Sequence, residues 1–224
     1  MRLESVVPWG RSLAEYADMF ALSERDQRSG VLDCGGGPAS CAAETAERGF
    51  DVVSCDPLYA FDVERIAARI AETYDVVLAG VEASKDRYVW HSIGSPARLG
   101  EVRMAAMRAF LRDYPEGRQV GRYVAGGLPA LPFAAERFGL ALCSHFLFTY
   151  SAQFSTGFHV ASVREMCRVA REARIFPLLD MSGNPSPHLE PVLAALRRLG
   201  YDARTERVPY EFQVGGSQML RVRR

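Results

Sequence analysis

The feature that most constrains the fold is a run of three glycines between a short strand pattern and a helical pattern. The apolar pair at 31–32 leads into glycines at 35–37, and a helix-forming segment follows over 42–49. A second apolar run at 52–55 ends at Asp56. Strand, glycine turn, helix and strand together take about 26 residues, the size of a parallel βαβ crossover. The segment therefore predicts an α/β protein with a parallel sheet.

Strand and helix patterns alternate along most of the remaining chain. The expected helices repeat apolar residues at three- and four-residue steps, and the expected strands are short apolar runs. The segment 163–174 alternates Arg with Glu, which is typical of a solvated helical face. Glycines 215–216 predict a hairpin between the last two strands. We expect further helices over 11–22, 162–173 and 187–200, and further strands over 122–126, 138–148, 174–180, 204–214 and 218–224.

Residues 57–120 depart from this alternation. Apolar residues recur at helical steps over 63–81, behind Asp62, which can cap a helix, and again over 99–110. The second helix is expected to stop at 114–117, where the sequence is Tyr-Pro-Glu-Gly. The pattern predicts two helices inserted into an α/β core after its second strand.

Length and charge limit the classes of function. A chain of 224 residues suits a single domain, 1–224. Its 27 basic and 27 acidic side chains cancel, so no nucleic-acid partner is expected. No apolar run approaches the roughly 20 residues of a membrane span. Glu4, Arg11 and Glu15 interrupt the region where a secretory leader needs apolar residues, so we expect a cytoplasmic protein without membrane contact.

The cysteines do not indicate a disulfide framework or a metal site. Their number is odd and no CxxC pair occurs, so buried thiols are the simpler interpretation. No cluster of His, Cys and carboxylate residues has the spacing of metal ligands, and no bound metal is expected. The five cysteines are Cys34, Cys41, Cys55, Cys143 and Cys167.

The glycine turn and its acidic neighbours indicate a nucleoside cofactor. Glycines let a ligand approach the backbone closely, and the helix that follows offers unpaired N–H groups. Asp56 is placed to accept hydrogen bonds from the ribose hydroxyls that NAD and S-adenosylmethionine share. Asp33, just before the glycines, suits an ammonium group better than a pyrophosphate. S-adenosylmethionine is therefore favoured, and an NAD(P)-dependent oxidoreductase of Rossmann type is the alternative.

These segments together resemble the class I S-adenosylmethionine-dependent methyltransferases, in particular the small-molecule type with a methyltransferase domain 11 pattern. The resemblance covers 28–56 and 121–224 and rests on the segments LDCGGGPAS, VVSCD, GGLPALPF and FGLALCSHFLF and on the final paired strands. It implies an α/β, Rossmann-like, doubly wound sheet of seven mostly parallel strands with an antiparallel last strand. Residues 57–120 then form a helical insertion after strand two, and their position suggests a lid over the acceptor pocket.

The resemblance also implies where the cofactor would be held. The glycine turn contacts the amino-acid portion, and Asp56 contacts the ribose. Gly127 stands where the family has a carboxylate near the adenine, so backbone and apolar contact by Leu128 is expected instead. The predicted cofactor-binding residues are Asp33, Cys34, Gly35, Gly36, Gly37, Asp56, Pro57, Gly127, Leu128, Cys143, Ser144 and Tyr16.

The predicted reaction is methyl transfer from S-adenosylmethionine to a small or medium-sized acceptor, leaving S-adenosylhomocysteine. Positioning of the acceptor against the methyl group supplies much of the rate enhancement, and a general base is optional. His145 is the first candidate for a base and Tyr150 the second, although a framework role is the alternative for His145. A non-catalytic S-adenosylmethionine-binding module is a further alternative, and a homodimer is left open.

A hydrolase triad of Ser144, His145 and Asp180 is not expected. Adjacent side chains on a strand point to opposite faces, and the sequence lacks a G-x-S-x-G turn.

Overall fold

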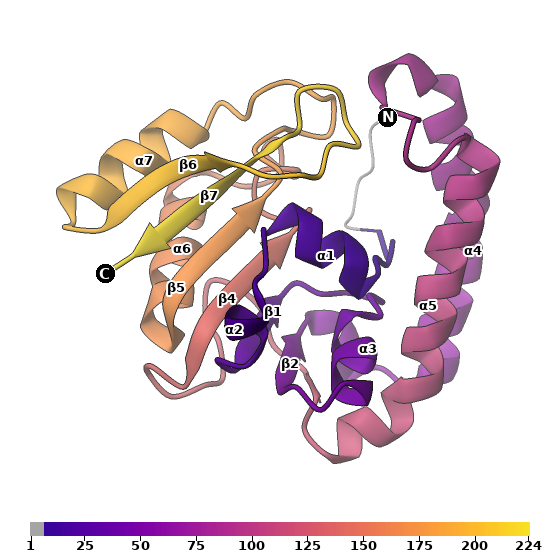
Figure 1. Ribbon diagram of the computed structural model, residues 1–224, viewed down its shortest axis with the longest axis horizontal. Coiled ribbons are helices and arrows are strands. Elements are labelled where there is room, and N and C mark those ends of the chain that lie inside the picture. Colours follow the sequence, from indigo (N-terminus) through magenta and orange to yellow (C-terminus); the bar gives the residue numbers. More distant parts are fainter. Residues whose placement is uncertain (1–6) are drawn as a thin grey trace.

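The structure, a computed structural model, describes residues 7–224 as a seven-stranded sheet with helices on both faces (Figure 1). Glu4, one of the charged residues that disfavour a secretory leader, lies outside the described residues. The strands are β1 Val31–Cys34, β2 Val52–Cys55, β3 Tyr123–Val124, β4 Phe138–Ser144, β5 Ala170–Phe176, β6 Asp202–Arg207 and β7 Gln218–Arg223. The helices are α1 Leu13–Met19, α2 Glu24–Gln27, α3 Cys41–Glu47, α4 Val63–Ala83, α5 Pro96–Gln119, α6 Thr156–Val169 and α7 Leu189–Arg198, with short 3-10 turns η1 Pro57–Ala60 and η2 Lys85–Arg87.

The sheet has the predicted topology. Its strand order is β3-β2-β1-β4-β5-β7-β6, and of these seven strands β7 runs opposite to the other six. The Rossmann-like, mostly parallel sheet with an antiparallel last strand is thereby confirmed. The order reverses between β1 and β4, so the loops that leave these two strands diverge. In open α/β sheets, ligands bind in the crevice that such a reversal creates at the carboxyl ends of the strands.

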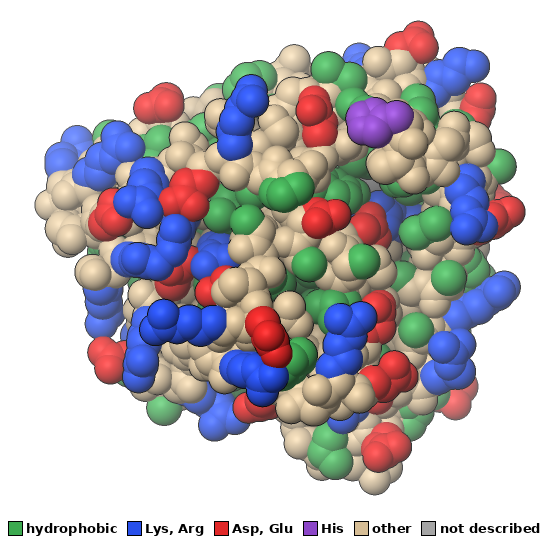
Figure 2. Space-filling model, in the orientation of Figure 1, with side chains coloured by type: hydrophobic (Ala, Val, Ile, Leu, Met, Phe, Trp, Pro, Cys, Tyr) green, Lys and Arg blue, Asp and Glu red, His purple; other side chains and the backbone are tan. Residues whose placement is uncertain are grey.

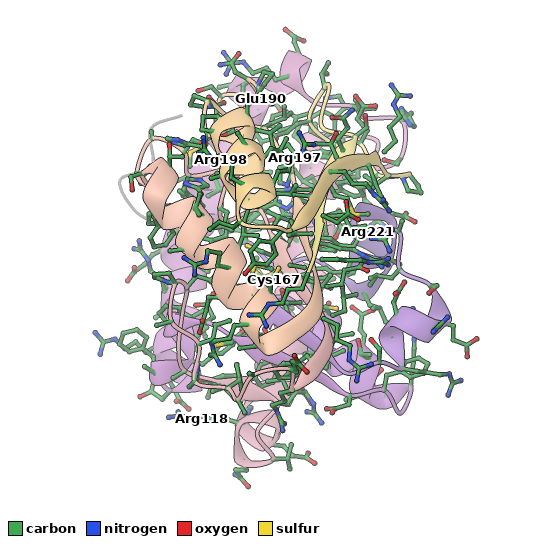
Figure 3. All side chains as sticks on the ribbon, turned by 90° about the vertical axis from the view of Figure 1, so that its left-hand side faces the viewer. Arg118, Cys167, Glu190, Arg197, Arg198 and Arg221 are labelled. Carbon is green, nitrogen blue, oxygen red and sulfur yellow. The ribbon has the colours of Figure 1, made fainter. Side chains whose placement is uncertain are left out.

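Two apolar cores form because successive residues of a strand point to opposite faces of the sheet. Leu32 of β1 packs in one core with side chains of α6 and α7, and the adjacent Val31 packs in the other core with α1, α3 and α5. Figure 3 views the side that α6 and α7 cover, where Glu190 lies near the start of α7 and Arg197 and Arg198 lie near its end. This charge order suits the dipole of the helix.

The two predicted helices of the insertion are present as α4 and α5, which stand side by side at one end of the sheet (Figure 1). Asp62 caps α4, since its Oδ1 accepts a hydrogen bond of 2.8 Å from Arg65 N. The base of the insertion is fixed by four mutually contacting rings: Tyr59, Phe110, Tyr114 and Tyr123. The insertion is thus part of the main core.

The predicted stop of the second helix at 114–117 is wrong, because α5 continues through Pro115 to Gln119. A proline costs a helix one backbone hydrogen bond, and tertiary contacts compensate here. Tyr114 Oη donates to the carbonyls of Tyr59 and Phe61 at 3.0 and 2.8 Å.

Several strand and helix ends also differ from the prediction. The strand expected over 138–148 ends at Ser144, because His145 has a positive φ of 50°. The helix expected over 11–22 is shortened at its start by a capping box at Ser12, and a second capping box at Ser23 begins the separate short helix α2. The last two strands form the expected hairpin, although β6 stops at Arg207.

The solvated helical face predicted over 163–174 is wrong for its second half. The helix ends at Val169, and the chain continues as β5, with Glu172 and Arg174 largely buried. Glu172 forms ion pairs with Arg174 at 2.6 Å, Arg221 at 2.8 Å and Arg223 at 2.6 Å. Arg221 and Arg223 come from β7, far away in the sequence, so the alternating pattern alone resembled an exposed helix.

The surface seen in Figure 2 intersperses acidic and basic side chains. Among residues 7–224, no helix combines the length and apolarity that crossing a membrane requires.

Gly10 joins the N-terminal segment to the glycine turn, and its replacement tests this packing. A Cβ at Gly10 would overlap the carbonyl oxygen of Pro38 and lie 2.9 Å from Met107 Cγ. We expect Gly10→Ala to lower the free energy of unfolding by about 1–3 kcal/mol, because backbone must move to admit the methyl group. Chemical denaturation measures the change. The control is Gly157→Ala in α6, where the nearest atom is an ordinary 3.7 Å away. Equal stabilities of Gly10→Ala and the unaltered protein would contradict the packing.

Candidate active site

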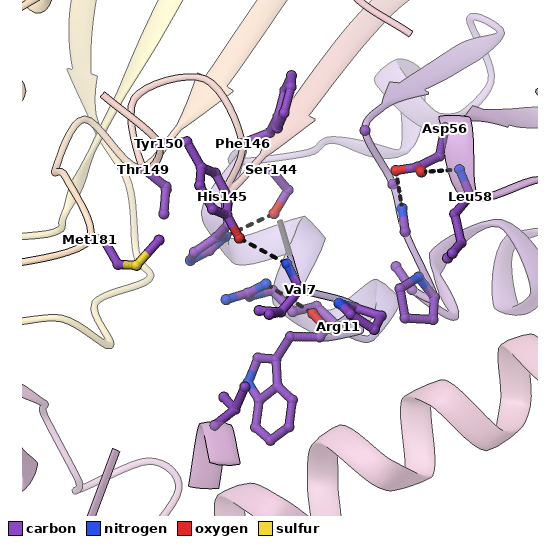
Figure 4. Close-up of a pocket in the computed structure, with 18 of the residues that line it drawn as sticks. Val7, Arg11, Asp56, Leu58, Ser144, His145, Phe146, Thr149, Tyr150 and Met181 are labelled. Carbon is purple, nitrogen blue, oxygen red and sulfur yellow. Dashed lines mark hydrogen bonds between the residues drawn. The ribbon is translucent and has the colours of Figure 1, made fainter. Parts of the chain in front are cut away.

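A cavity of about 840 Å³ lies at the carboxyl ends of the central strands, where the strand order reverses. Its wall combines the glycine turn, the N-terminal segment 7–11, one side of α4, the loop after β4 and the loop between β6 and β7 (Figure 4). This size is within the range of small-molecule sites.

The glycine turn is tightly constrained. Gly35 and Gly37 have positive φ values of 72° and 54°, which favour glycine. A Cβ at Gly36 would overlap side-chain oxygens of Ser54 and Asp33. A side chain is therefore disfavoured at each of the three positions, and the turn presents bare backbone to the cavity.

Asp56 is joined directly to this turn. Its Oδ2 accepts a hydrogen bond of 3.0 Å from Gly37 N, and its Oδ1 accepts one of 2.7 Å from Leu58 N (Figure 4). Burial raises the pKa of Asp56. A carboxylate has about four acceptor positions, so two are left for a ligand. The donor set of a ribose, two hydroxyls, fits that remainder.

Asp33 lies behind the turn and does not line the cavity. It is 1% exposed and accepts hydrogen bonds from Tyr16 Oη at 3.1 and 3.2 Å and from Ser54 Oγ at 3.3 Å. Burial raises the pKa of Asp33 to about 7, although these two hydroxyls lower it in part. Tyr16 lies between this carboxyl group and the cavity, which it lines.

Most of the other residues predicted for the cofactor meet at the cavity. Cys34 and Cys143 do not, since both side chains are fully buried in the core beneath the sheet end. Gly127 lines the cavity, and a Cβ there would lie 3.1 Å from Pro57 Cγ, which gives a steric reason for the missing carboxylate. The cavity brings together Tyr16, Gly35, Gly36, Gly37, Asp56, Pro57, Gly127, Leu128, Ser144, His145 and Tyr150.

His145 is turned toward Ser144 by its positive φ. Ser144 Oγ and His145 Nδ1 are 2.9 Å apart, so the premise that these adjacent side chains point to opposite faces is wrong (Figure 4). Asp180 instead accepts hydrogen bonds from the backbone of Ser182 and Asn184, and no carboxylate of residues 7–224 is hydrogen-bonded to His145. A Ser-His pair is present, and the third member of a triad is not.

The protonation state of His145 follows from its surroundings. Burial, together with the positive charges of Arg11 and Arg103, holds the pKa of His145 well below its usual value. The imidazole is therefore neutral at pH 7, and Nε2 has no hydrogen-bond partner within the described part of the chain. A neutral imidazole with one free nitrogen can accept a proton when Nδ1 carries the hydrogen.

Tyr150 contributes to the same wall. Its hydroxyl accepts a hydrogen bond of 3.2 Å from Val7 N, which ties the N-terminal segment to the loop after β4 (Figure 4). Burial raises the pKa of Tyr150, so the phenol is protonated at neutral pH.

Several residues of the wall were not predicted from the sequence. They lie on loops whose position depends on contacts between distant segments, and only the capping pattern Ser12-x-x-Glu15 marked this region as ordered. The additional wall residues include Arg11, Phe146, Thr149, Met181 and Phe212. Within residues 7–224, no group of three or more His, Cys, Asp or Glu side chains is arranged to hold a metal ion.

Comparison with known proteins identifies the fold. No family model matches the chain. It is 29% identical over 225 residues to the uncharacterized protein MJ0045 of Methanocaldococcus jannaschii, a match that covers 100% of this chain and 99% of that protein. Among solved structures, the mitomycin 7-O-methyltransferase MmcR is similar with a TM-score of 0.50 and 12% identity over 95% of this chain. The chain spans 53% of the length of MmcR.

A second solved structure is magnesium protoporphyrin IX methyltransferase of Synechocystis PCC 6803 with bound S-adenosylmethionine. Its TM-score is 0.44 and its identity 14%, over 95% of this chain and 74% of that protein. The chain has the fold of class I S-adenosylmethionine-dependent methyltransferases, as its strand order and the likeness to MmcR show.

The buried carboxyl group of Asp33 predicts a pH-dependent stability. Its pKa is raised from 3.8 to about 7, so the folded state retains a proton that the unfolded state releases. This term favours folding fully below pH 4, and the advantage declines as the pH rises through 7. We expect Asp33→Asn to gain stability relative to the unaltered protein between pH 4 and 7, by up to ~4 kcal/mol at the upper end.

Denaturation midpoints measured over this pH range would show the gain. Asp18→Asn on α1 removes one exposed carboxyl group and is the control for the loss of a negative charge. A difference for Asp33→Asn that shrinks as the pH rises would refute the raised pKa.

Proposed function

We propose that the protein is an S-adenosylmethionine-dependent methyltransferase that acts on a small or medium-sized acceptor. The observation that carries this proposal is the direct bond between the glycine turn and Asp56, at the edge of a cavity that also contains a neutral histidine. The fold supports the proposal, and fold alone does not establish activity.

The adenosine end of the cofactor would lie along Asp56, Pro57 and Leu128. The two unused acceptor positions of Asp56 suit the ribose hydroxyls, and Leu128 offers an apolar surface for the adenine. Gly127 provides backbone contact without a carboxylate. Since this carboxylate is absent, adenine binding would depend on shape and backbone groups at this position.

The amino-acid end would lie over the glycine turn, next to Tyr16 and Ser144. Tyr16 donates its hydroxyl hydrogen to Asp33 and is thereby fixed at the cavity wall. A cationic ligand group above the turn would also favour ionisation of Asp33, whose pKa is raised in its absence. The ionised carboxylate of Asp33 would then stabilise the cationic group of the ligand by electrostatic attraction over a short distance.

When bound, the cofactor would supply an electrophilic methyl group on a sulfonium. The residues of the chain would position the acceptor and exclude water, which supplies much of the rate enhancement for such a displacement. For an oxygen or nitrogen acceptor, His145 Nε2 would take the acceptor proton. Ser144 would orient the ring through the 2.9 Å contact with Nδ1.

The insertion 57–120 would act as a lid that selects the acceptor. Ile66, Val77 and Val81 of α4 line the cavity opposite the sheet. The tip of the insertion bonds to the loop between β6 and β7: Val89 N donates to Phe212 O at 2.7 Å, and Val214 N donates to Arg87 O at 3.0 Å.

An NAD(P)-dependent oxidoreductase is disfavoured by the turn itself. A pyrophosphate binds to free N–H groups at the glycine turn, and Gly37 N already donates to Asp56. The negative charge of Asp56 beside that amide would also repel a phosphate.

Replacing Asp56 tests the cofactor site. We expect Asp56→Ala to weaken S-adenosylhomocysteine binding by about 1–3 kcal/mol, the usual scale for hydrogen bonds to a charged group. Isothermal titration calorimetry measures the affinity, with NAD⁺ and NADP⁺ titrated in parallel. Asp62→Ala is a suitable control, because Asp62 caps α4 and does not line the cavity. Unchanged affinity in folded Asp56→Ala would rule out the proposed contact between Asp56 and the ribose. Tight binding of NAD⁺ or NADP⁺ instead of S-adenosylhomocysteine would reject the proposed function.

A further inference from the structure

Arg11 places a positive charge in the wall of the cavity and forms no ion pair with a carboxylate of residues 7–224. Arg11 lines the cavity and donates from Nη1 to Trp9 O at 3.2 Å. Its Nε is buried and has no hydrogen-bond partner among residues 7–224. A buried charge is costly unless it is paired. The guanidinium of Arg11 is therefore held in place with donors still to be used.

Glu15, the carboxylate whose charge acts on Arg11, already has other partners. Glu15 binds Arg103 Nη1 at 2.5 Å, the hydroxyl of Tyr210 at 3.0 Å and the backbone N of Ser12 at 3.1 Å. Burial would raise the pKa of Glu15, but Arg103 and Arg11 lower it to about 2. Arg103 is fully buried, so its own charge needs that carboxylate. Two guanidinium groups thus share one carboxylate, and one net positive charge is left at the cavity wall.

The unpaired guanidinium lies at the reacting end of the cavity. After burial, its positive charge is a cause of the lowered pKa of His145. Figure 4 shows Arg11 extended toward His145, on the side away from Asp56. The wall of the same cavity contains the aromatic and apolar side chains of Trp9, Phe146, Tyr150, Met181 and Phe212.

The other charged residues of the wall also favour an anionic acceptor. The wall contains Arg65 and Arg87 as further arginines, besides the pair of Arg69 with Glu72. Asp56 is the other acidic residue of the wall, and the proposed function assigns it to the ribose. S-adenosylmethionine, with its sulfonium, ammonium and carboxylate, carries a net positive charge. An acceptor that joins it would be bound best as an anion.

We propose that the acceptor is a carboxylic acid with an aromatic or similarly apolar body, and that Arg11 binds its carboxylate. The inference rests on the proposed function and adds the chemical class of the acceptor. Arg103 is a positioning residue in this scheme: by holding Glu15, it keeps Arg11 available. A guanidinium forms paired hydrogen bonds with a carboxylate, which an ammonium cannot reproduce.

The test uses 2-naphthoate and its uncharged amide, 2-naphthamide, as paired probes. Each is titrated at pH 7 into protein saturated with S-adenosylhomocysteine, and NMR shifts report the Kd. We expect the unaltered protein to prefer the acid by at least about tenfold, the scale of a hydrogen bond to a charged group. Arg11→Gln should lose this preference, and Arg11→Lys should keep part of it. Arg98→Gln is the matched control and should keep all of it, because Arg98 pairs with Glu101 at 2.6 Å and does not line the cavity.

A second variant changes the charge balance without changing Arg11. In Arg103→Met, Glu15 is released and can pair with Arg11, so the preference for the acid should fall. Arg103 is buried and its loss will reduce stability, whereas the side chain of Arg11 makes a single hydrogen bond to Trp9 O and Arg11→Gln should fold. Full acid preference in folded Arg11→Gln would overturn the inference, as would equal binding of the two probes by the unaltered protein.

The carboxylate of the cofactor is the competing partner for Arg11, and 5′-methylthioadenosine distinguishes the two. This nucleoside lacks the amino-acid portion. If Arg11→Gln weakens S-adenosylhomocysteine by tenfold and leaves 5′-methylthioadenosine unchanged, Arg11 serves the cofactor and the acceptor assignment is overturned. If S-adenosylhomocysteine fails to bind the unaltered protein, the proposed function itself fails, a result that is separate from the behaviour of the probes.

Discussion

The bond between Gly37 N and Asp56 is the interaction on which the candidate site depends. It fixes the end of β2 against the turn that follows β1, and these two strand ends bound the crevice on one side. The turn can make this bond because Gly37 adopts a positive φ and Gly36 leaves room for Asp33 and Ser54. A side chain at Gly36 would crowd Ser54 and Asp33, and one at Gly37 would strain the backbone that makes this bond.

Two buried ionisable groups are preorganised on opposite sides of this turn. Asp33 lies behind it with hydroxyl partners and no cation among residues 7–224 at its carboxyl group, and Arg11 lies in front with no carboxylate of its own. Both cost folding free energy, since burial disfavours the charged form of each. Such a cost is typical of sites whose missing partner is a ligand.

The sequence predicted the sheet and many residues of the cavity wall, because both depend on local patterns. The glycine turn, Asp56 and the 3.6-residue periodicity of α4 are each visible within a short window. The errors occurred where contacts between residues far apart in the sequence determine the local structure. Pro115 stays within a helix because Tyr114 reaches back to Phe61, and Glu172 is buried because β7 supplies arginines. Arg11 could not be recognised either, since its importance depends on Arg103, which lies in the insertion.

The two borders of the sheet bear on how copies of this chain could associate. At one border β3 has only two residues, and at the other β6 presents Asp202, Arg204 and Glu206 along its length. Short or charged outer strands resist pairing with the backbone of another molecule. A dimer built by extending the sheet is therefore disfavoured, and self-association would have to use a helical or loop surface instead.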